Sequence, residues 1–259
     1  MEAIGSFINM KQVRELAKRN GANVDDPNLE EYVEDYKKSV YQKWVKSAKQ
    51  NKNDYYNSLS LYDGGQKVSF EFSRWKPELQ ADVQKAKDVG NQAFMLAKQI
   101  LSKPTKVVMV GGPGVGKTSL ALAMLSTLKE HGKSTLFVSS AEFTSMYGER
   151  YDYSDIKKRL ESVSKAMKKV DVLVIDDLGT EGGVRADRAI RRDVMSELEH
   201  VANARFDIQN NRTLKSTITT TNNNIQELQN IYSPKMISRL LPHKAANQII
   251  FDGLDDMRE

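Results

Sequence analysis

Apolar residues recur every three or four positions between Asn28 and Gln50, which is the period of an amphipathic helix. Asp26 and Pro27 precede this stretch and provide an N-cap followed by proline in the first turn. Acidic residues lie near its start and lysines follow, an order that suits the helix dipole on a solvated face. Docking of a partner or of nucleic acid is the alternative that this polarity leaves open. The apolar positions are Leu29, Val33, Tyr36, Val40 and Trp44.

The helical pattern breaks between Asn51 and Gly65, where the chain becomes polar and ends in two glycines. Stretches of this composition commonly connect domains. A chain of 259 residues also exceeds the roughly 100 to 200 residues typical of one domain. We therefore predict two domains: a small helical domain with its linker at residues 1–65, and a larger domain at residues 66–259.

Strands and helices alternate from Lys106 onward. A helical period from about Pro77 to Leu101 precedes them. Parallel strands need crossover connections that return over the sheet, so this alternation predicts an α/β fold with helices on both faces of a parallel sheet. The strand candidates are Val107–Val110, Thr135–Ser139, Val172–Ile175, Thr217–Thr220 and Gln248–Phe251. Helices between them are expected to begin near Lys117, Asp155 and Asp187.

Composition narrows the chemistry that this fold can perform. The chain has no cysteine, which excludes disulfides, thiol catalysis and cysteine-ligated zinc, and its three histidines are scattered. Any metal is therefore expected to arrive with a nucleotide. The formal charge of +5 does not decide whether nucleic acid is a partner. Since the sequence contains neither a long apolar run nor a signal-peptide pattern, we expect a soluble, cytoplasmic protein with no membrane partner.

A complete phosphate-loop motif, G-x-x-x-x-G-K-[ST], runs from Gly111 to Thr118, after a β-branched strand and at the start of a helix. In such a loop, backbone N–H groups converge on phosphates, Lys117 places a cation on the β and γ oxygens, and the Thr118 hydroxyl can bind magnesium. The motif predicts ATP and Mg²⁺ as cofactors. The expected nucleotide contacts are Gly112, Pro113, Gly114, Val115, Gly116, Lys117, Thr118 and Ser119.

Two acids end the apolar strand that begins at Val172, in the manner of a Walker B strand. Asp176 is expected to hold magnesium through its water shell. An ordinary turn after a strand also favours aspartate, but the phosphate loop upstream favours the functional interpretation.

Taken together, Val68 to Arg258 resembles the ATPase domain of the DnaC, DnaI and IstB family of AAA+ proteins. The resemblance implies a P-loop AAA+ (ASCE) fold that is nearly lidless, with a small helical N-terminal domain in front of it. The segments that carry it, besides the phosphate loop, are Asp176-Asp-Leu-Gly179, Thr-Thr-Asn222, Ser238-Arg-Leu240 and Phe251-Asp-Gly-Leu-Asp-Asp-Met-Arg258.

The resemblance also implies roles for single residues. Lys117 would be a catalytic residue through its contact with the phosphates, and Asp177 would polarise the attacking water. Asn222 would serve as the sensor I amide that holds this water or the γ-phosphate. Arg239 resembles an arginine finger that completes the site of a neighbouring subunit in a homo-oligomer, and Arg258 would take a role related to sensor II. A turn asparagine and a plain surface arginine are the alternatives at Asn222 and Arg239.

An arginine-rich segment, Gly182 to Arg192, follows the acidic strand, where related loaders and initiators carry an extra element that faces single-stranded DNA. Arginine contacts phosphates and stacks on bases without reading sequence. Pairing with Asp187 and Asp193 within a helix is the alternative. The candidate DNA-binding residues are Arg185, Arg188, Arg191 and Arg192.

The leading functional hypothesis is an ATP-dependent loader of a DnaB-family replicative helicase onto single-stranded DNA. The N-terminal domain would bind the helicase, and hydrolysis would act as an assembly and release switch. Because cysteine is absent, the zinc-bound N-terminal module of DnaI-like loaders is excluded, and a helical DnaC-like domain fits better. An IstB-like transposition helper and a nucleotide-gated DNA-binding adaptor with little turnover are the alternatives.

Overall fold

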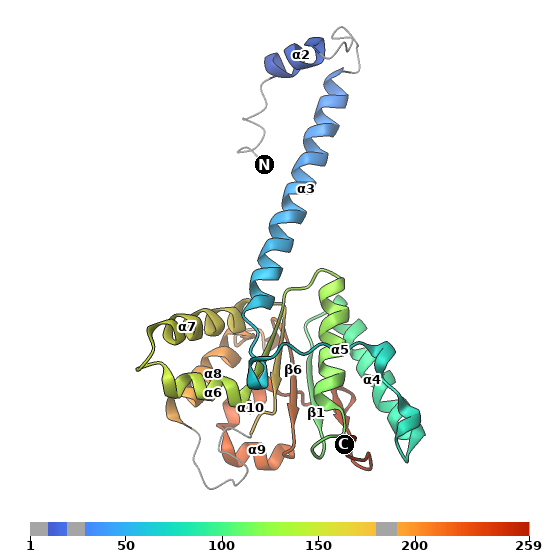
Figure 1. Ribbon diagram of the computed structural model, residues 1–259, viewed down its shortest axis with the longest axis vertical. Coiled ribbons are helices and arrows are strands. Elements are labelled where there is room, and N and C mark those ends of the chain that lie inside the picture. Colours follow the sequence, from blue (N-terminus) through green and yellow to red (C-terminus); the bar gives the residue numbers. More distant parts are fainter. Residues whose placement is uncertain (1–9, 20–28, 180–190, 259) are drawn as a thin grey trace. The chain divides into compact units, whose positions relative to one another are not determined.

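The computed structural model describes residues 10–19, 29–179 and 191–258 (Figure 1). The chain divides into two compact units, Met1–Lys52 and Asn53–Glu259. The first unit is helical, as the sequence predicts, and contains α2 (Met10–Arg19) and most of α3 (Leu29–Ser58). In the described parts of the chain, no helix has the length and apolar character needed to cross a membrane.

The segment predicted as a linker is folded onto the second unit instead. Helix α3 runs through to Ser58, and Leu61 then forms a parallel bridge with Val138. Tyr56 and Leu61 are buried, the latter with 1% of its surface exposed. The prediction of a linker is therefore wrong from residue 53 onward. Buried apolar side chains such as Tyr56 and Leu61 fix this stretch to the second unit, although most of its residues are polar.

The second unit is built on a five-stranded sheet of order β2-β3-β6-β1-β7, in which every pairing is parallel. This confirms the predicted fold class. Successive side chains of a strand point to opposite faces, so Val108 enters one apolar cluster and Val107 and Met109 enter the other. The strands are β1 (Lys106–Val110), β2 (Thr135–Ser139), β3 (Val172–Asp176), β6 (Ser216–Thr221) and β7 (Gln248–Ile250).

Helices cover both faces of this sheet, as Figure 1 shows. One face packs against α4 (Val83–Ser102) and α5 (Lys117–Glu130). The helices that supply the other cluster are α6 (Ser140–Glu149), α7 (Ser154–Lys169), α8 (Arg192–Ala204), α9 (Ile225–Ile231) and α10 (Pro234–Leu240). Two buried layers therefore hold the sheet in the middle of the unit.

Several short elements have no counterpart in the sequence analysis. The helical period predicted from Pro77 begins instead with a separate turn, and α4 starts after Asp82, whose carboxylate accepts a hydrogen bond from the Lys85 N–H at 2.9 Å. The helix start expected near Asp187 lies outside the described residues. The remaining short elements are the 3₁₀ turns η1 (Asp63–Gly65), η2 (Phe72–Arg74), η3 (Pro77–Leu79) and η4 (Ala245–Asn247), and a hairpin of β4 (Phe206–Asp207) and β5 (Arg212–Thr213).

Candidate nucleotide-binding site

The phosphate loop connects the carboxyl end of β1 to the first turn of α5. Gly114 and Gly116 have φ of 73° and 95°, in the left-handed region that residues with a Cβ rarely adopt. A Cβ on Gly116 would also lie 2.6 Å from the Trp75 ring. The loop therefore needs glycine at both positions, and it ends at a helix N-terminus whose free N–H groups and dipole favour an anion.

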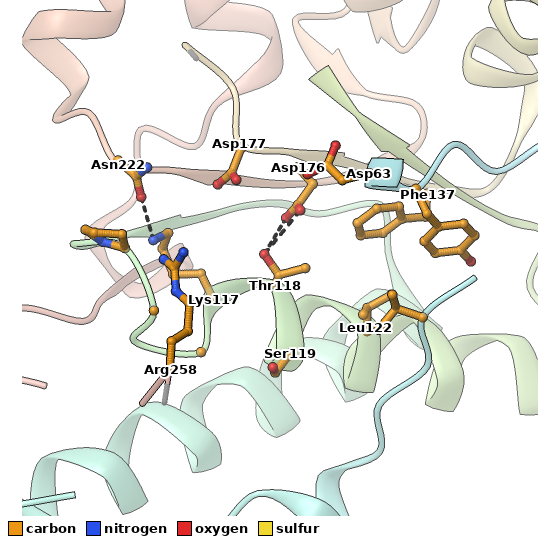
Figure 2. A pocket seen from close by; sticks show the side chains of 15 residues that line it. Asp63, Lys117, Thr118, Ser119, Leu122, Phe137, Asp176, Asp177, Asn222 and Arg258 are labelled. Atoms are coloured by element: carbon orange, nitrogen blue, oxygen red, sulfur yellow. Dashed lines mark hydrogen bonds between the residues drawn. The ribbon is translucent and has the colours of Figure 1, made fainter. Parts of the chain in front are cut away.

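Lys117 is held at the mouth of this loop by three oxygen acceptors. Its Nζ donates to the carbonyls of Gly111 and Gly112 at 3.0 and 2.6 Å. It also donates to Asn222 Oδ1 at 2.7 Å, the bond drawn in Figure 2. Burial lowers the pKa of Lys117, and the neighbouring Asp177 and Asp176 carboxylates oppose that shift. The structure thus joins the phosphate loop to the end of β6, where Asn222 follows the last strand residue.

Thr118 and Asp176 meet directly across the cavity. The Thr118 hydroxyl donates to Asp176 Oδ1 at 3.0 Å, and the Thr220 hydroxyl donates to the same oxygen at 2.6 Å. Burial, with a smaller contribution from Asp177, raises the pKa of Asp176 to about 6 against these hydrogen bonds. A hydroxyl and a buried carboxylate are oxygen ligands of the kind that Mg²⁺ takes, so Thr118 and Asp176 fit the ion that the motif implies.

Asp177 occupies a left-handed backbone position, with φ of 53°, at the turn after β3. Its N–H donates to Thr220 Oγ1 at 2.8 Å, which fixes this turn against β6. Figure 2 shows its carboxylate between Asn222 and Asp176, and burial raises its pKa. A non-glycine residue in this conformation is uncommon and often marks a functional site.

A cavity of about 340 Å³ collects these groups. Of the predicted nucleotide contacts, Gly112 accepts from Lys117, and the Val115 side chain is buried in the core, so only its backbone can face a ligand. The other predicted residues that line the cavity are Pro113, Gly114, Gly116, Lys117, Thr118, Ser119, Asp176, Asp177 and Asn222.

Asp63 also lines this cavity, and the sequence analysis missed it. It lies beside Asp176 in Figure 2 and accepts a hydrogen bond from the Ser139 hydroxyl at the end of β2. It belongs to the segment predicted as a linker, and no local motif marks it. Its place in the site follows from the pairing of Leu61 with Val138, which is a tertiary contact.

The C-terminal segment brings Arg258 to the same cavity. The Met257 N–H donates to the Gly114 carbonyl at 3.2 Å, so this segment packs on the phosphate loop. Gln80 holds it further back, since its side chain accepts from the Asp255 N–H at 2.7 Å and donates to the Asp255 carbonyl at 3.1 Å. Arg258, for which the resemblance implies a role related to sensor II, thus lies at the candidate nucleotide cavity.

Other predicted residues lie elsewhere. Arg239 is half-buried in α10, where it donates to Asn203 Oδ1, and it is not among the residues that line the cavity. Arg191, the residue before α8, pairs with Asp193 at 3.0 Å, and Arg192 is exposed at the start of that helix. Arg185 and Arg188 lie outside the described residues.

Comparison with known proteins agrees with a nucleotide site. A family model for the IstB-like ATP binding protein matches residues 67–243. The chromosomal replication initiator protein DnaA of Helicobacter hepaticus is 30% identical over 115 residues, which are 43% of this chain and 23% of that protein. The replicative helicase loader DnaC of Escherichia coli is 23% identical over 133 residues, 51% of this chain and 49% of the loader. The chain thus matches at most about half the length of these two relatives.

Among solved structures, a crystal structure of DnaI covers 73% of this chain and 90% of its own, with 23% identity and a TM-score of 0.49. A crystal structure of the DnaC helicase loader covers 62% of this chain and 89% of its own, with 23% identity and a TM-score of 0.44.

Proposed function

This chain belongs to the family of IstB-like ATP-binding proteins, and on that premise we propose that it is a Mg²⁺-dependent AAA+ ATPase that loads a DnaB-family replicative helicase onto single-stranded DNA. The observation that carries the ATPase part is the cavity in which Lys117 meets Asn222 and Thr118 meets Asp176. These are the cation, the amide and the metal-ligating pair that phosphoryl transfer to water requires.

Each residue has a defined part in the proposed reaction. The loop N–H groups and Lys117 bind the ATP phosphates. Thr118 and Asp176 would hold Mg²⁺, which would supply positive charge to those phosphates. Asp177 accepts a proton from the attacking water, and its raised pKa moves it toward the range in which a general base works at neutral pH. Asn222 orients that water, or the γ-phosphate, through its side-chain amide.

The loader part of the proposal rests on similarity. The DnaC relative is named a replicative helicase loader, and a helical unit precedes the ATPase unit here. In this proposal the N-terminal unit binds the helicase, single-stranded DNA contacts Arg185, Arg188, Arg191 and Arg192, and the chain assembles as a homo-oligomer. The family description IstB-like favours a second candidate, a transposition helper that engages a transposase.

Two substitutions test the ATPase directly. We expect Lys117→Ala to abolish ATP binding without unfolding the protein, because the glycine turns remain while the cation is lost. We expect Asp177→Asn to retain ATP but to lower turnover by about 10²- to 10⁴-fold, the usual contribution of a general base. Nucleotide titration, circular dichroism and phosphate release measure these effects. Lys158→Ala, on the exposed surface of α7, is the control.

Loading is tested with the full chain, the replicative helicase of the same cell and a closed circle of single-stranded DNA. We expect the helicase to sediment with the circle when wild-type protein and ATP are present, and not when Lys117→Ala replaces it. If the chain hydrolyses ATP but leaves the helicase off the circle, the loader proposal is wrong. Retention of a transposase in its place would favour the transposition helper.

A further inference from the structure

A second cavity, of about 590 Å³, opens at the amino ends of the parallel strands. Lys106 begins β1 at this edge, whereas the phosphate loop follows the other end of the same strand. Five strand residues at about 3.3 Å each separate the two edges by roughly 15 Å. This amino-edge cavity, lined by Lys103, Lys106, Phe206, Ser238, His243 and Lys244 among others, is therefore distinct from the nucleotide site.

The ionisable side chains that line the amino-edge cavity are all basic. Three lysines and a histidine line it, and no aspartate or glutamate does among the residues that the structure describes. The other lining groups include the side-chain amides of Gln99, Asn211 and Asn247. A lining of cations and neutral hydrogen-bonding groups suits an anion and disfavours a cation or an apolar ligand.

Lys106 is the centre of this arrangement. It is half-buried, its Nζ donates to the Ser238 carbonyl at 2.7 Å, and it lies 5.7 Å from the centre of the Phe206 ring. Burial lowers its pKa to about 8, and none of the ion pairs found in the described chain involves it. A cation withdrawn from water gains most from an anionic partner that restores the lost solvation.

The cationic lining also continues along the sheet edge. A smaller adjoining cavity shares Lys103 and adds Lys133 and Lys215, next to the first residues of β3 and β6. Asp171 is the acid there: the Ser134 backbone and hydroxyl donate to it at 2.9 and 2.8 Å, and Lys215 and Lys133 lie close enough to favour its ionised form, so it partly balances these two cations. A row of cations beside an aromatic ring matches a chain of phosphates better than a single small ion.

We propose that the amino-edge cavity is a second phosphate-binding site, which takes the phosphate groups of a single-stranded nucleic acid at the edge of the sheet opposite the nucleotide site. A free phosphate compound offers the same chemistry, so the test separates the two sources. The proposal does not depend on helicase loading, because it rests on the cavity and its lysines alone.

The first arm measures binding of a fluorescent oligothymidylate by anisotropy at several salt concentrations. We expect Lys106→Met to weaken binding and to reduce the logarithmic salt slope by about 0.7, the value for one lost phosphate contact on a single strand. Methionine keeps the buried aliphatic stem, and Lys106→Arg, which keeps the charge, should restore the slope. Lys158→Met makes the same change of charge on α7 and should bind as wild type. ATP affinity should be unchanged in all of them.

The second arm titrates inorganic pyrophosphate into Lys117→Ala protein by calorimetry, so that the phosphate loop does not compete. Binding that Lys106→Met abolishes, together with an unchanged oligothymidylate slope, would identify a free phosphate compound as the ligand. A reduced slope in the first arm identifies the strand. If Lys106→Met alters neither titration, and circular dichroism shows that it is folded, the amino-edge cavity is not a phosphate site.

Discussion

Asp176 combines burial with the negative charge that its proposed metal-binding role requires. Only 4% of its surface is exposed, and two threonine hydroxyls supply its hydrogen bonds. Its pKa of about 6 lies above the ordinary 3.8, so the ionised form is less favourable in the folded protein than in the unfolded chain. We therefore expect the buried, ionised carboxylate to lower the free energy of unfolding whenever no cation is bound to it.

Replacing Asp176 with asparagine should therefore stabilise the nucleotide-free protein at high pH. Because the folded pKa is raised, the penalty is absent below about pH 4, grows as the pH rises toward 6, and is complete above it. A pKa difference of one corresponds to about 1.4 kcal/mol, so we expect a gain of roughly 1 to 3 kcal/mol at pH 8 and almost none at pH 4. Urea unfolding in a chelator measures it.

Asparagine retains an oxygen that can accept from Thr118 and Thr220, so lost hydrogen bonds should not mask the effect. Asp152→Asn, at an exposed position, is the matched control and should change little at either pH. If Asp176→Asn instead lowers the free energy of unfolding equally at pH 8 and pH 4, the charge of Asp176 does not destabilise the folded protein.

The segment between α3 and η1 acts as an extension of the sheet edge. The Leu61 N–H donates to the Phe137 carbonyl at 2.8 Å, and its own carbonyl accepts from the Ser139 N–H at 3.0 Å. The Ser60 hydroxyl accepts from the Phe137 N–H at 3.1 Å. These bonds cover the outer edge of β2, which would otherwise expose unpaired backbone groups. They also set Asp63 beside the nucleotide cavity.

Leu61→Ala should show how much this short element contributes. The side chain is almost completely buried, so its removal leaves a cavity and should lower the free energy of unfolding by about 2 to 4 kcal/mol. Leu214→Ala, at a leucine with 42% of its surface exposed, should cost far less. Equal midpoints in urea for the two variants would mean that residues 59–65 are not part of the core.

The elements that sequence predicts well are those whose signal is local. The strands at Thr135 and Val172 are apolar or β-branched runs between helices, and the phosphate loop is contiguous, so neighbours in sequence are neighbours in the site. Helices α9 and α10 have seven residues each, too short to repeat an apolar period. Asp63 and Trp75 reach the loop by tertiary packing, which no local pattern carries.

In the described part of the second unit, the two ends of the sheet carry different sites. The carboxyl ends of β1, β3 and β6 carry the phosphate loop, Asp176 and Asn222, as expected where parallel strands end at one edge. The amino ends carry the lysine-lined cavity. Helix α10 contributes to the amino edge through Ser238, whose carbonyl accepts a hydrogen bond from Lys106. Arg239 is the next residue of the same helix.

Arg239 is the residue whose proposed role needs more than one copy of the chain. Within one chain it donates to Asn203 on α8 and is absent from the lining of the described nucleotide cavity. We expect it to act on a neighbour's ATP in a head-to-tail assembly, a heterologous contact that can build a ring or a spiral. Arg239→Ala should bind ATP as wild type but hydrolyse it about 10³-fold more slowly when assembled, the lower range for an arginine finger.

Mixing variants distinguishes a role between subunits from a role within one. An Arg239→Ala protomer keeps an intact phosphate loop, and a Lys117→Ala protomer keeps an intact finger. An interface that joins that loop to that finger should therefore hydrolyse ATP faster than either variant does alone. Phosphate release above the sum of the separate variants, at equal total protein and with DNA present, supports the assignment. If sedimentation shows that the variants co-assemble and no activity returns, Arg239 acts within its own chain, through the α10 to α8 contact with Asn203.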